Sequence, residues 1–195
     1  MSPVLPWEVI ERVIDQSCDD PSTLHNVSLT CRQLRPRSIS HMFRHFDLKT
    51  RDHVFSLCEY LLRKSHLRQL VRSIAIHPSY FMPCPLLHVL YNLTECTFSI
   101  EDEEPLKTIT FHSSTLACCR LIGTGIRKLC IHNLVFSTLL SLSRVLLAID
   151  NLEELVFSKV DIRQKGVELQ YKQIKHLSRR LQLRNLAVGV ASHAL

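Results

Sequence analysis

The chain has 195 residues, of which 46% are hydrophobic and 22% are charged, and its 24 Lys and Arg against 18 Asp and Glu give a net charge of +6. This balance is typical of a folded protein with a buried core and excludes a disordered chain. Only four glycines are present, and neither GxGxxG nor GxxxxGK[ST] occurs, which excludes the common phosphate-binding loops. The motifs GxSxG and HExxH are also missing. We therefore expect a protein that is not an enzyme, with no catalytic residue and no cofactor.

Cysteine usage and hydropathy bear on the compartment. The eight cysteines are scattered and none is spaced as CxxC, so we expect reduced core thiols rather than a disulfide framework. Cys130 and His132 lack a second ligand pair at zinc spacing, and no metal site is predicted. Residues 1–13 carry no basic region of a secretory signal, and three prolines in the uncharged stretch 73–94 exclude a transmembrane helix. The protein is expected in the cytoplasm, the nucleus or both, without a membrane partner.

The first fifty residues predict three short helices. Pro6 suits the start of the first helix, because proline there loses only an N–H that would be unpaired anyway. Asp20 followed by Pro21 predicts the start of the second helix, and Pro36 ends that helix and begins the third. A unit this small is marginally stable, so an apolar stripe that it leaves uncovered needs a partner. The apolar residues at helical spacing are Val9, Ile10, Val13 and Ile14 in the first helix and Leu24, Val27, Cys31 and Leu34 in the second.

Within residues 3–47 three segments follow one another in a specific order. They are Leu5-Pro6-Trp7-Glu8-Val9-Ile10, then Asp20-Pro21-Ser22-Thr23-Leu24, then Val27-Ser28-Leu29-Thr30-Cys31-Arg32. In order and spacing they resemble the F-box of large fungal F-box-like families, in which LPxEL[IL] opens the first helix and [VT]CR closes the second. The sequence departs from that pattern at Trp7 and at Leu34, where many members carry tryptophan shortly after the Cys-Arg pair.

The resemblance implies a helical surface that docks a Skp-family adaptor and, through it, a cullin-RING ubiquitin ligase. The chain would then be the substrate-recognition subunit of an SCF-type (Skp, cullin, F-box) ligase, and the chemistry would belong to its partners. The same residues could instead form the internal core of the three helices, and the sequence leaves both roles open. Carried over by position, the adaptor-binding residues are Leu5, Pro6, Val9, Ile10, Leu24, Val27, Cys31 and Leu34.

From residue 71 onward a pattern recurs with apolar residues at its first, fourth and sixth positions. The copies start 13 to 31 residues apart, which centres on the period of leucine-rich repeats. The asparagine expected after each strand is missing, so the repeat is degenerate. The six copies are Val71-Ile74-Ile76, Leu93-Cys96-Phe98, Leu106-Ile109-Phe111, Ile126-Leu129-Ile131, Leu152-Leu155-Phe157 and Leu183-Leu186-Val188.

Helix-like stretches at 52–62, 136–149 and 170–181 supply the crossovers that parallel strands need. The predicted fold is therefore α/β, with a three-helix F-box module at 3–47 followed by an irregular leucine-rich-repeat-like solenoid with a parallel sheet at 48–195. The apolar ending before Leu195 lacks a polar capping repeat, so we expect the solenoid to be incomplete at its C-terminus.

Solenoids bind partners through side chains that the core does not use. The residues between the apolar strand positions carry both signs of charge, which favours an unidentified protein target. An alternative hypothesis is a nucleic-acid or acidic-partner binder using the basic stretch 172–184, although Tyr171 is the only aromatic residue nearby. A hydrolase using Ser and His is disfavoured, because the eleven histidines define no constellation. The predicted substrate-binding residues are Arg72, Glu95, Lys107, Arg127, Lys128, Glu153 and Arg184.

Overall fold

A computed structural model describes residues 5–77, 84–100, 108–111, 113–164 and 181–189. These residues form a mixed α/β fold with a parallel sheet, as predicted. The chain divides into two compact units, Met1–Phe46 and Asp47–Leu195. The boundary predicted from the sequence, after residue 47, lies one residue away. We call the two parts the helical unit and the sheet unit.

The helical unit consists of α1 (Trp7–Gln16), α2 (Pro21–Thr30) and α3 (Arg35–Met42). The Asp20 side chain accepts hydrogen bonds from the N–H groups of Ser22 and Thr23 at 3.0 and 3.1 Å, which satisfies donors that the first turn of α2 leaves unpaired. Helix α2 packs on α3, and α1 contacts α3. The apolar side chains buried in this unit are Ile14 and Leu24, so its core is small for the number of residues that it must order.

An ionic cluster joins α1 to α3. The Arg37 guanidinium donates from Nε and Nη2 to the two carboxylate oxygens of Asp15, both at 2.7 Å, and its Nη1 lies 3.0 Å from Oε2 of Glu11. His41 Nε2 lies 2.9 Å from Oδ1 of Asp15. The hydrogen bonds from Arg37 and His41 lower the pKa of Asp15 from 3.8 to about 2, against a smaller opposing effect of desolvation. A bidentate guanidinium–carboxylate pair fixes the orientation of both partners, so the cluster sets how α1 meets α3.

Acid is expected to weaken the helical unit through Asp15. Because its folded-state pKa is lowered, the carboxylate contributes its full stabilisation above pH 3.8 and loses it as the pH falls to about 2. Asp15→Asn removes that contribution, so the two proteins should differ most at pH 6 and converge towards pH 2. Trp7, the only tryptophan, lies in α1 and reports urea unfolding of this unit in the full chain. Asp19→Asn, at an exposed neighbouring site, is the control, and a difference that does not change with pH would contradict the prediction.

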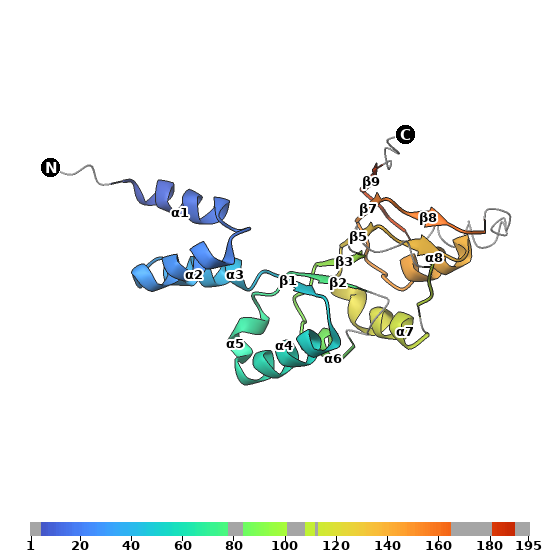
Figure 1. Cartoon of the computed structure of the whole chain (residues 1–195), viewed down its shortest axis with the longest axis horizontal. Helices are drawn as coiled ribbons and strands as arrows, with labels where there is room; N and C mark the ends of the chain where they lie inside the picture. The colour runs from blue at the N-terminus through green and yellow to red at the C-terminus, as the bar shows by residue number, and fades with distance from the viewer. Residues whose placement is uncertain (1–4, 78–83, 101–107, 112, 165–180, 190–195) are drawn as a thin grey trace. The chain divides into compact units, whose positions relative to one another are not determined.

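The sheet unit contains two sheets with parallel strand pairs, and from β3 onward long strands of one sheet alternate along the chain with short strands of the other (Figure 1). The long strands pair in order with their first residues aligned. A further strand, β1 (His45–Leu48), lies at the edge of the larger sheet beside β2. The long strands are β2 (Ser73–Ile76), β3 (Glu95–Ser99), β5 (Lys128–His132), β7 (Glu154–Ser158) and β9 (Asn185–Gly189); the short ones are β4 (Thr108–Ile109), β6 (Val135–Phe136) and β8 (Asp161–Ile162).

Helices lie in the connections between the long strands. Thr138 caps α8 by accepting from Ser141 N–H at 3.1 Å, while the Ser141 hydroxyl accepts from Thr138 N–H. Helix α6 contacts both α4 and α7. The predicted helix at 52–62 is confirmed, the one at 136–149 is shorter because its first residue belongs to β6, and the one at 170–181 lies outside the described residues. The elements are α4 (Arg51–Arg63), α5 (Ser65–Arg68), α6 (Cys84–Leu87), α7 (Ser113–Ile122), the 3₁₀ turn η1 (Gly123–Gly125) and α8 (Leu139–Leu146).

The starts of the long strands share one hydrogen-bonding arrangement. The carbonyl of Arg72 accepts from the N–H groups of Thr94 and Glu95 at 2.9 and 3.0 Å. The carbonyl of Thr94 accepts in the same way from the first residues of the next strand, and the pattern continues at Arg127 and Glu153. In each case the residue just before a long strand accepts two hydrogen bonds through its carbonyl. The donors are the N–H groups of the first residue of the next long strand and of the residue before it.

Five of the six predicted strand copies lie in the larger sheet. The copy Leu106-Ile109-Phe111 also contributes a strand, but Thr108–Ile109 forms β4 and pairs with β6 in the smaller sheet; Leu106 lies outside the described residues. Each of β3, β5 and β7 is followed by a short strand, and the apolar spacing does not distinguish the long strands from the short ones. Phe111 is half-buried and packs against the core, since its ring centroid lies 5.2 Å from that of Phe98 and 6.1 Å from that of Phe136.

The turn after β5 contains an asparagine close to the position where the leucine-rich-repeat pattern expects one. Asn133 is buried, has a left-handed φ of 54°, and donates from Nδ2 to the carbonyl of Ile100 at 3.3 Å. Asparagine tolerates this conformation better than most residues. It stands one residue before the position that the consensus spacing predicts. Lys159 occupies the same place after β7 with φ 53°, so successive repeats turn in the same way.

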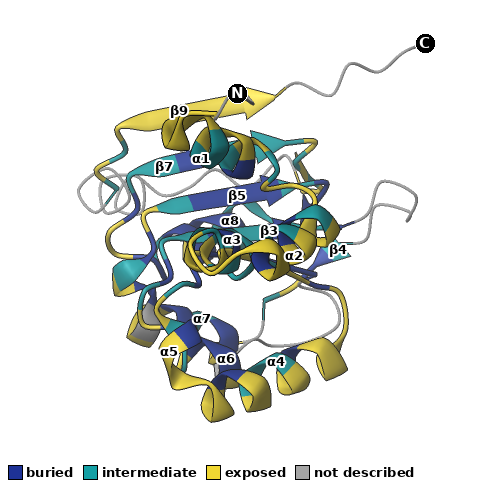
Figure 2. Cartoon of the chain, turned by 90° about the vertical axis from the view of Figure 1, so that its left-hand side faces the viewer, coloured by how far each residue is buried: buried dark blue, intermediate teal, exposed yellow. Residues whose placement is uncertain are grey.

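The larger sheet contributes buried residues to the core of the sheet unit, and in β2 and β5 consecutive residues, on both faces, are buried. Alternate residues point to opposite faces of a strand, and the buried set includes Ile74, Leu129 and Ile131. Burial falls off along the row, since all five residues of β9 are exposed (Figure 2). All four residues of β2 are buried, whereas β3, β5 and β7 are buried only in part.

Among the described glycines, Gly125, just before β5, is expected to be the least tolerant of substitution. A Cβ there would lie 2.9 Å from the carbonyl oxygen of Leu93, so backbone would have to move. Gly125→Ala should lower the free energy of unfolding by about 1–3 kcal/mol, as overpacking does. Gly123→Ala is the matched control, because its Cβ would lie 3.4 Å from the Ala148 carbonyl oxygen. Thermal unfolding followed by circular dichroism measures both, and equal midpoints for the two variants would contradict the prediction.

Candidate functional site

The helical unit leaves part of an apolar helix face uncovered. Leu5, directly before α1, is 63% exposed, and Val9 and Val13 within α1 are 41% and 56% exposed. Four-residue spacing places the three side chains along one side of the helix. Ile14 of the same helix, by contrast, is 2% exposed. The apolar arc of α1 is thus wider than the surface that α2 and α3 cover, and we call Leu5, Val9 and Val13 the α1 stripe.

The structure sorts the predicted adaptor-binding residues by accessibility. Pro6 and Cys31 are exposed, and Ile10, Val27 and Leu34 are half-buried. Leu24 is fully buried at 0% exposure, which favours the other role that the sequence left open for it, a residue of the core of the three helices. Its helix, α2, packs on α3.

Three exposed apolar residues of the helical unit were absent from the predicted set. Val13 continues the spacing of Leu5 and Val9, and that periodicity was the signal that could have identified it. Leu29 of α2 is 72% exposed, and Trp7 is 40% exposed with its Nε1 donating to Glu11 Oε1 at 3.1 Å. No periodic signal marks Leu29, because it lies off the apolar spacing of α2.

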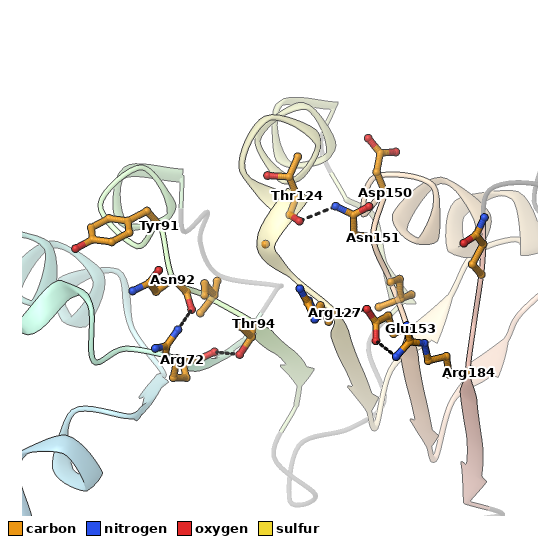
Figure 3. A pocket seen from close by; sticks show the side chains of 14 residues that line it. Arg72, Tyr91, Asn92, Thr94, Thr124, Arg127, Asp150, Asn151, Glu153 and Arg184 are labelled. Carbon is orange, nitrogen blue, oxygen red and sulfur yellow. Dashed lines mark hydrogen bonds and ion pairs between the residues drawn. The ribbon is translucent and has the colours of Figure 1, made fainter. Parts of the chain in front are cut away.

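In the sheet unit, a groove runs along the starts of the long strands (Figure 3). Its volume is about 720 Å³. One side is the row of residues that immediately precede the strands, and we call it the strand-start row: Arg72, Thr94, Arg127, Glu153 and Arg184. The other side comes from the turns that follow the helices, and includes Tyr91, Asn92, Thr124, Asp150 and Asn151.

Arginines dominate the charge of the strand-start groove. Glu153 lies between two of them, with Oε1 3.7 Å from Arg127 Nη1 and Oε2 3.3 Å from Arg184 Nη1. The side chains of Arg127 and Arg184 are 67% and 76% exposed. Arg72 donates from Nη1 to the Asn92 carbonyl at 3.4 Å, which directs it towards the turn wall. Four of the predicted substrate-binding residues are thereby brought together in one groove.

Two further predicted residues, Glu95 and Lys128, lie one position into the strands. Lys128 Nζ is 2.9 Å from Glu95 Oε1, and this pairing raises the pKa of Lys128. Further along the same row, Asn185 Nδ2 donates to Glu154 Oε1 at 3.2 Å. The charged side chains of this row therefore pair with side chains on the neighbouring strand. The remaining predicted residue, Lys107, lies outside the described residues.

Beside this row the Cys130 thiol is buried and lies 3.8 Å from Glu95 Oε1. Burial raises the pKa of Cys130, and burial raises that of Cys96 as well. A thiol with a raised pKa carries little thiolate at neutral pH and is a poor nucleophile. Both cysteines therefore serve as packing residues.

Within the described part of the chain, no group of three or more His, Cys, Asp and Glu is placed to hold a metal ion. Nor does any helix there have the length and apolarity that crossing a membrane requires. Of the basic residues at 172–184 on which the nucleic-acid hypothesis depends, Arg184 is described, and its guanidinium pairs with Glu153. That hypothesis stays a prediction.

The chain was compared with protein-family models, curated proteins and solved structures, and none of the three matches it.

Proposed function

We propose that the chain is the substrate-recognition subunit of an SCF-type ubiquitin ligase, in which the helical unit docks a Skp-family adaptor and the sheet unit holds a target protein. The observation that carries this proposal is the α1 stripe. A folded unit with a small core gains little by leaving Leu5, Val9 and Val13 in water, whereas a partner that covers them removes apolar surface from solvent. The residues that resemble an F-box lie in this same unit.

The two-unit division supports the second half of the proposal. The sheet unit has its own core, and its parallel strands present a row of side chains that the core does not use. Repeat architectures of this type offer extended surfaces to proteins. The chain would act through proximity, because holding a target beside the ubiquitin-carrying enzyme raises the effective concentration of its lysines. It would act in the cytoplasm, the nucleus or both.

Co-expression of the full chain with a Skp-family adaptor, followed by affinity capture, tests the proposal. We expect the adaptor to co-purify in equimolar amount and the complex to survive gel filtration. Cullin added to the complex should then be captured as well. An adaptor that stays in the unbound fraction at micromolar concentrations of both proteins would overturn the assignment.

A further inference from the structure

We propose that the strand-start groove binds an acidic, extended segment of the target protein, whose carboxylates pair with Arg72, Arg127 and Arg184. This inference deepens the proposed function and rests on the sheet unit being the target-binding part. It concerns the edge where the long strands begin, which is distinct from the strand faces themselves.

The arginines are spaced regularly along the groove. In the larger sheet β2 and β5 are separated by β3, and β5 and β9 are separated by β7. Neighbouring strands lie about 4.8 Å apart, so Arg72, Arg127 and Arg184 precede strand starts that follow one another at intervals of about 10 Å. An extended chain rises about 3.1–3.4 Å per residue, and every third residue of a polyproline II segment returns to the same side. Acidic side chains at every third position of such a segment would therefore meet successive arginines.

The charges of the groove are open to an incoming carboxylate. Glu153 partly neutralises Arg127 and Arg184, but both guanidinium groups are exposed, and their Nη1 atoms lie more than 3 Å from the Glu153 carboxylate oxygens. Ion pairs of this kind contribute little in water, so they can be replaced at small cost. A guanidinium has five donors and can hold two carboxylates at once. The side chains that line the groove include three arginines and two carboxylates, Glu153 and Asp150, so their net charge is positive.

The backbone at this edge leaves recognition to side chains. The strand-start carbonyls of Arg72, Thr94, Arg127 and Glu153 each accept two N–H groups from the next strand. A bound segment would consequently not be recognised through backbone pairing with these groups. The opposite wall adds Tyr91, which is 63% exposed and offers an apolar surface, and Asn151, whose Nδ2 holds the Thr124 carbonyl at 2.8 Å. Figure 3 shows the Asn151 amide directed at the Thr124 carbonyl, beside Arg127 and Glu153 of the strand-start row.

The first residues of the long strands show why an acidic segment would bind in the strand-start groove rather than on the face of the sheet. Lys128 and Glu95 form a closer pair, at 2.9 Å, and are about one-third exposed. A ligand there would have to break that pair and desolvate both groups. In the strand-start row, by contrast, the cations outnumber their partner and remain accessible.

The probe is a fluorescein-labelled nine-residue peptide with glutamate at every third position, and binding to the full chain is measured by fluorescence anisotropy. We expect saturable binding that weakens with added salt. Arg127→Gln with Arg184→Gln should weaken it at least about tenfold, as expected from losing hydrogen bonds to charged groups. The peptide with glutamine in place of glutamate should not bind. No binding of the acidic peptide by the wild-type chain would overturn the proposal.

Arg51→Gln with Arg63→Gln is the matched control, because it removes the same charge from exposed sites on α4. Equal weakening by the control would show that net charge, and not the groove, attracts the peptide. An oligothymidine is the second probe. If it binds as tightly as the peptide and loses affinity in the same Arg127→Gln, Arg184→Gln variant, the ligand of the groove is a nucleic acid and not an acidic protein segment.

Adaptor capture separates the two proposals. The groove variant should capture the adaptor as the wild type does. A chain that captures adaptor but binds no acidic peptide would refute the groove proposal alone. A chain that binds the peptide through the groove but captures no adaptor would refute the ligase assignment and leave the class of ligand intact.

Discussion

Replacing Leu5 and Val9 with glutamate is expected to abolish capture of a Skp-family adaptor by the full chain. Both side chains are exposed, so neither substitution opens a cavity. In a docked complex they would be buried, and burying an apolar side chain of this size is worth about 1.5–3 kcal/mol. Two losses, together with the cost of burying two carboxylates, should raise the dissociation constant more than about 100-fold. Titration of the purified chain with adaptor measures the change.

The matched control for the α1 stripe lies in the sheet unit. Phe55 and Leu62 of α4 are 48% and 55% exposed, and their replacement by glutamate introduces the same charge. This variant should capture adaptor normally. If it loses capture to the same degree, the adaptor does not dock on the α1 stripe. Trp7 fluorescence would show in each case that the helical unit remains folded.

A second large effect is expected from one helix that carries two leucines in opposite environments. Leu24 is 0% exposed and Leu29 is 72% exposed, and both belong to α2. Leu24→Ala should cost about 2–5 kcal/mol through lost burial and the cavity left behind. A small core supplies no more than about 3–5 kcal/mol in total, so this variant should unfold the helical unit at room temperature.

Leu29→Ala should change the free energy of unfolding by no more than about 0.5 kcal/mol, as surface substitutions do. Urea unfolding of the full chain, followed by Trp7 fluorescence, compares the two variants. Equal destabilisation would show that α2 is packed on a different face from the one described. The pair also tests the core role of Leu24, because truncating a core leucine lowers the free energy of unfolding whereas truncating an exposed leucine barely changes it.

Much of the fold could be predicted because its signals are local. Pro6 and the Asp20-Pro21 pair mark helix starts that the structure places within one residue, since capping depends on neighbours in sequence. The long strands follow from alternating apolar residues. Helix α7 was missed because its buried residues include Thr115, Cys118 and Cys119, which have helical spacing but lack the leucine and isoleucine of a recognisable apolar stripe.

The candidate sites were predictable only in part. The alternation along each strand identified Arg72, Arg127, Glu153 and Arg184 as residues outside the core, but not that they share one groove. Their grouping depends on strand register, which one sequence does not contain. The opposite wall comes from turns such as Tyr91-Asn92, whose approach to the strand starts is set by the packing of the helices before them. Likewise the buried state of Leu24 depends on how α3 crosses α2.

The paired N–H donors at the strand starts have a consequence for how unequal repeats coexist. The long strands begin at residues 73, 95, 128, 154 and 185, so the connections between them differ in length. Because each strand is aligned to its predecessor at its first residues, the length of a connection does not alter the alignment. Insertions lengthen only the connecting segments, and the strand starts stay aligned along the edge of the sheet. Sequence drift can thus lengthen one repeat while the side chains along that edge keep their neighbours.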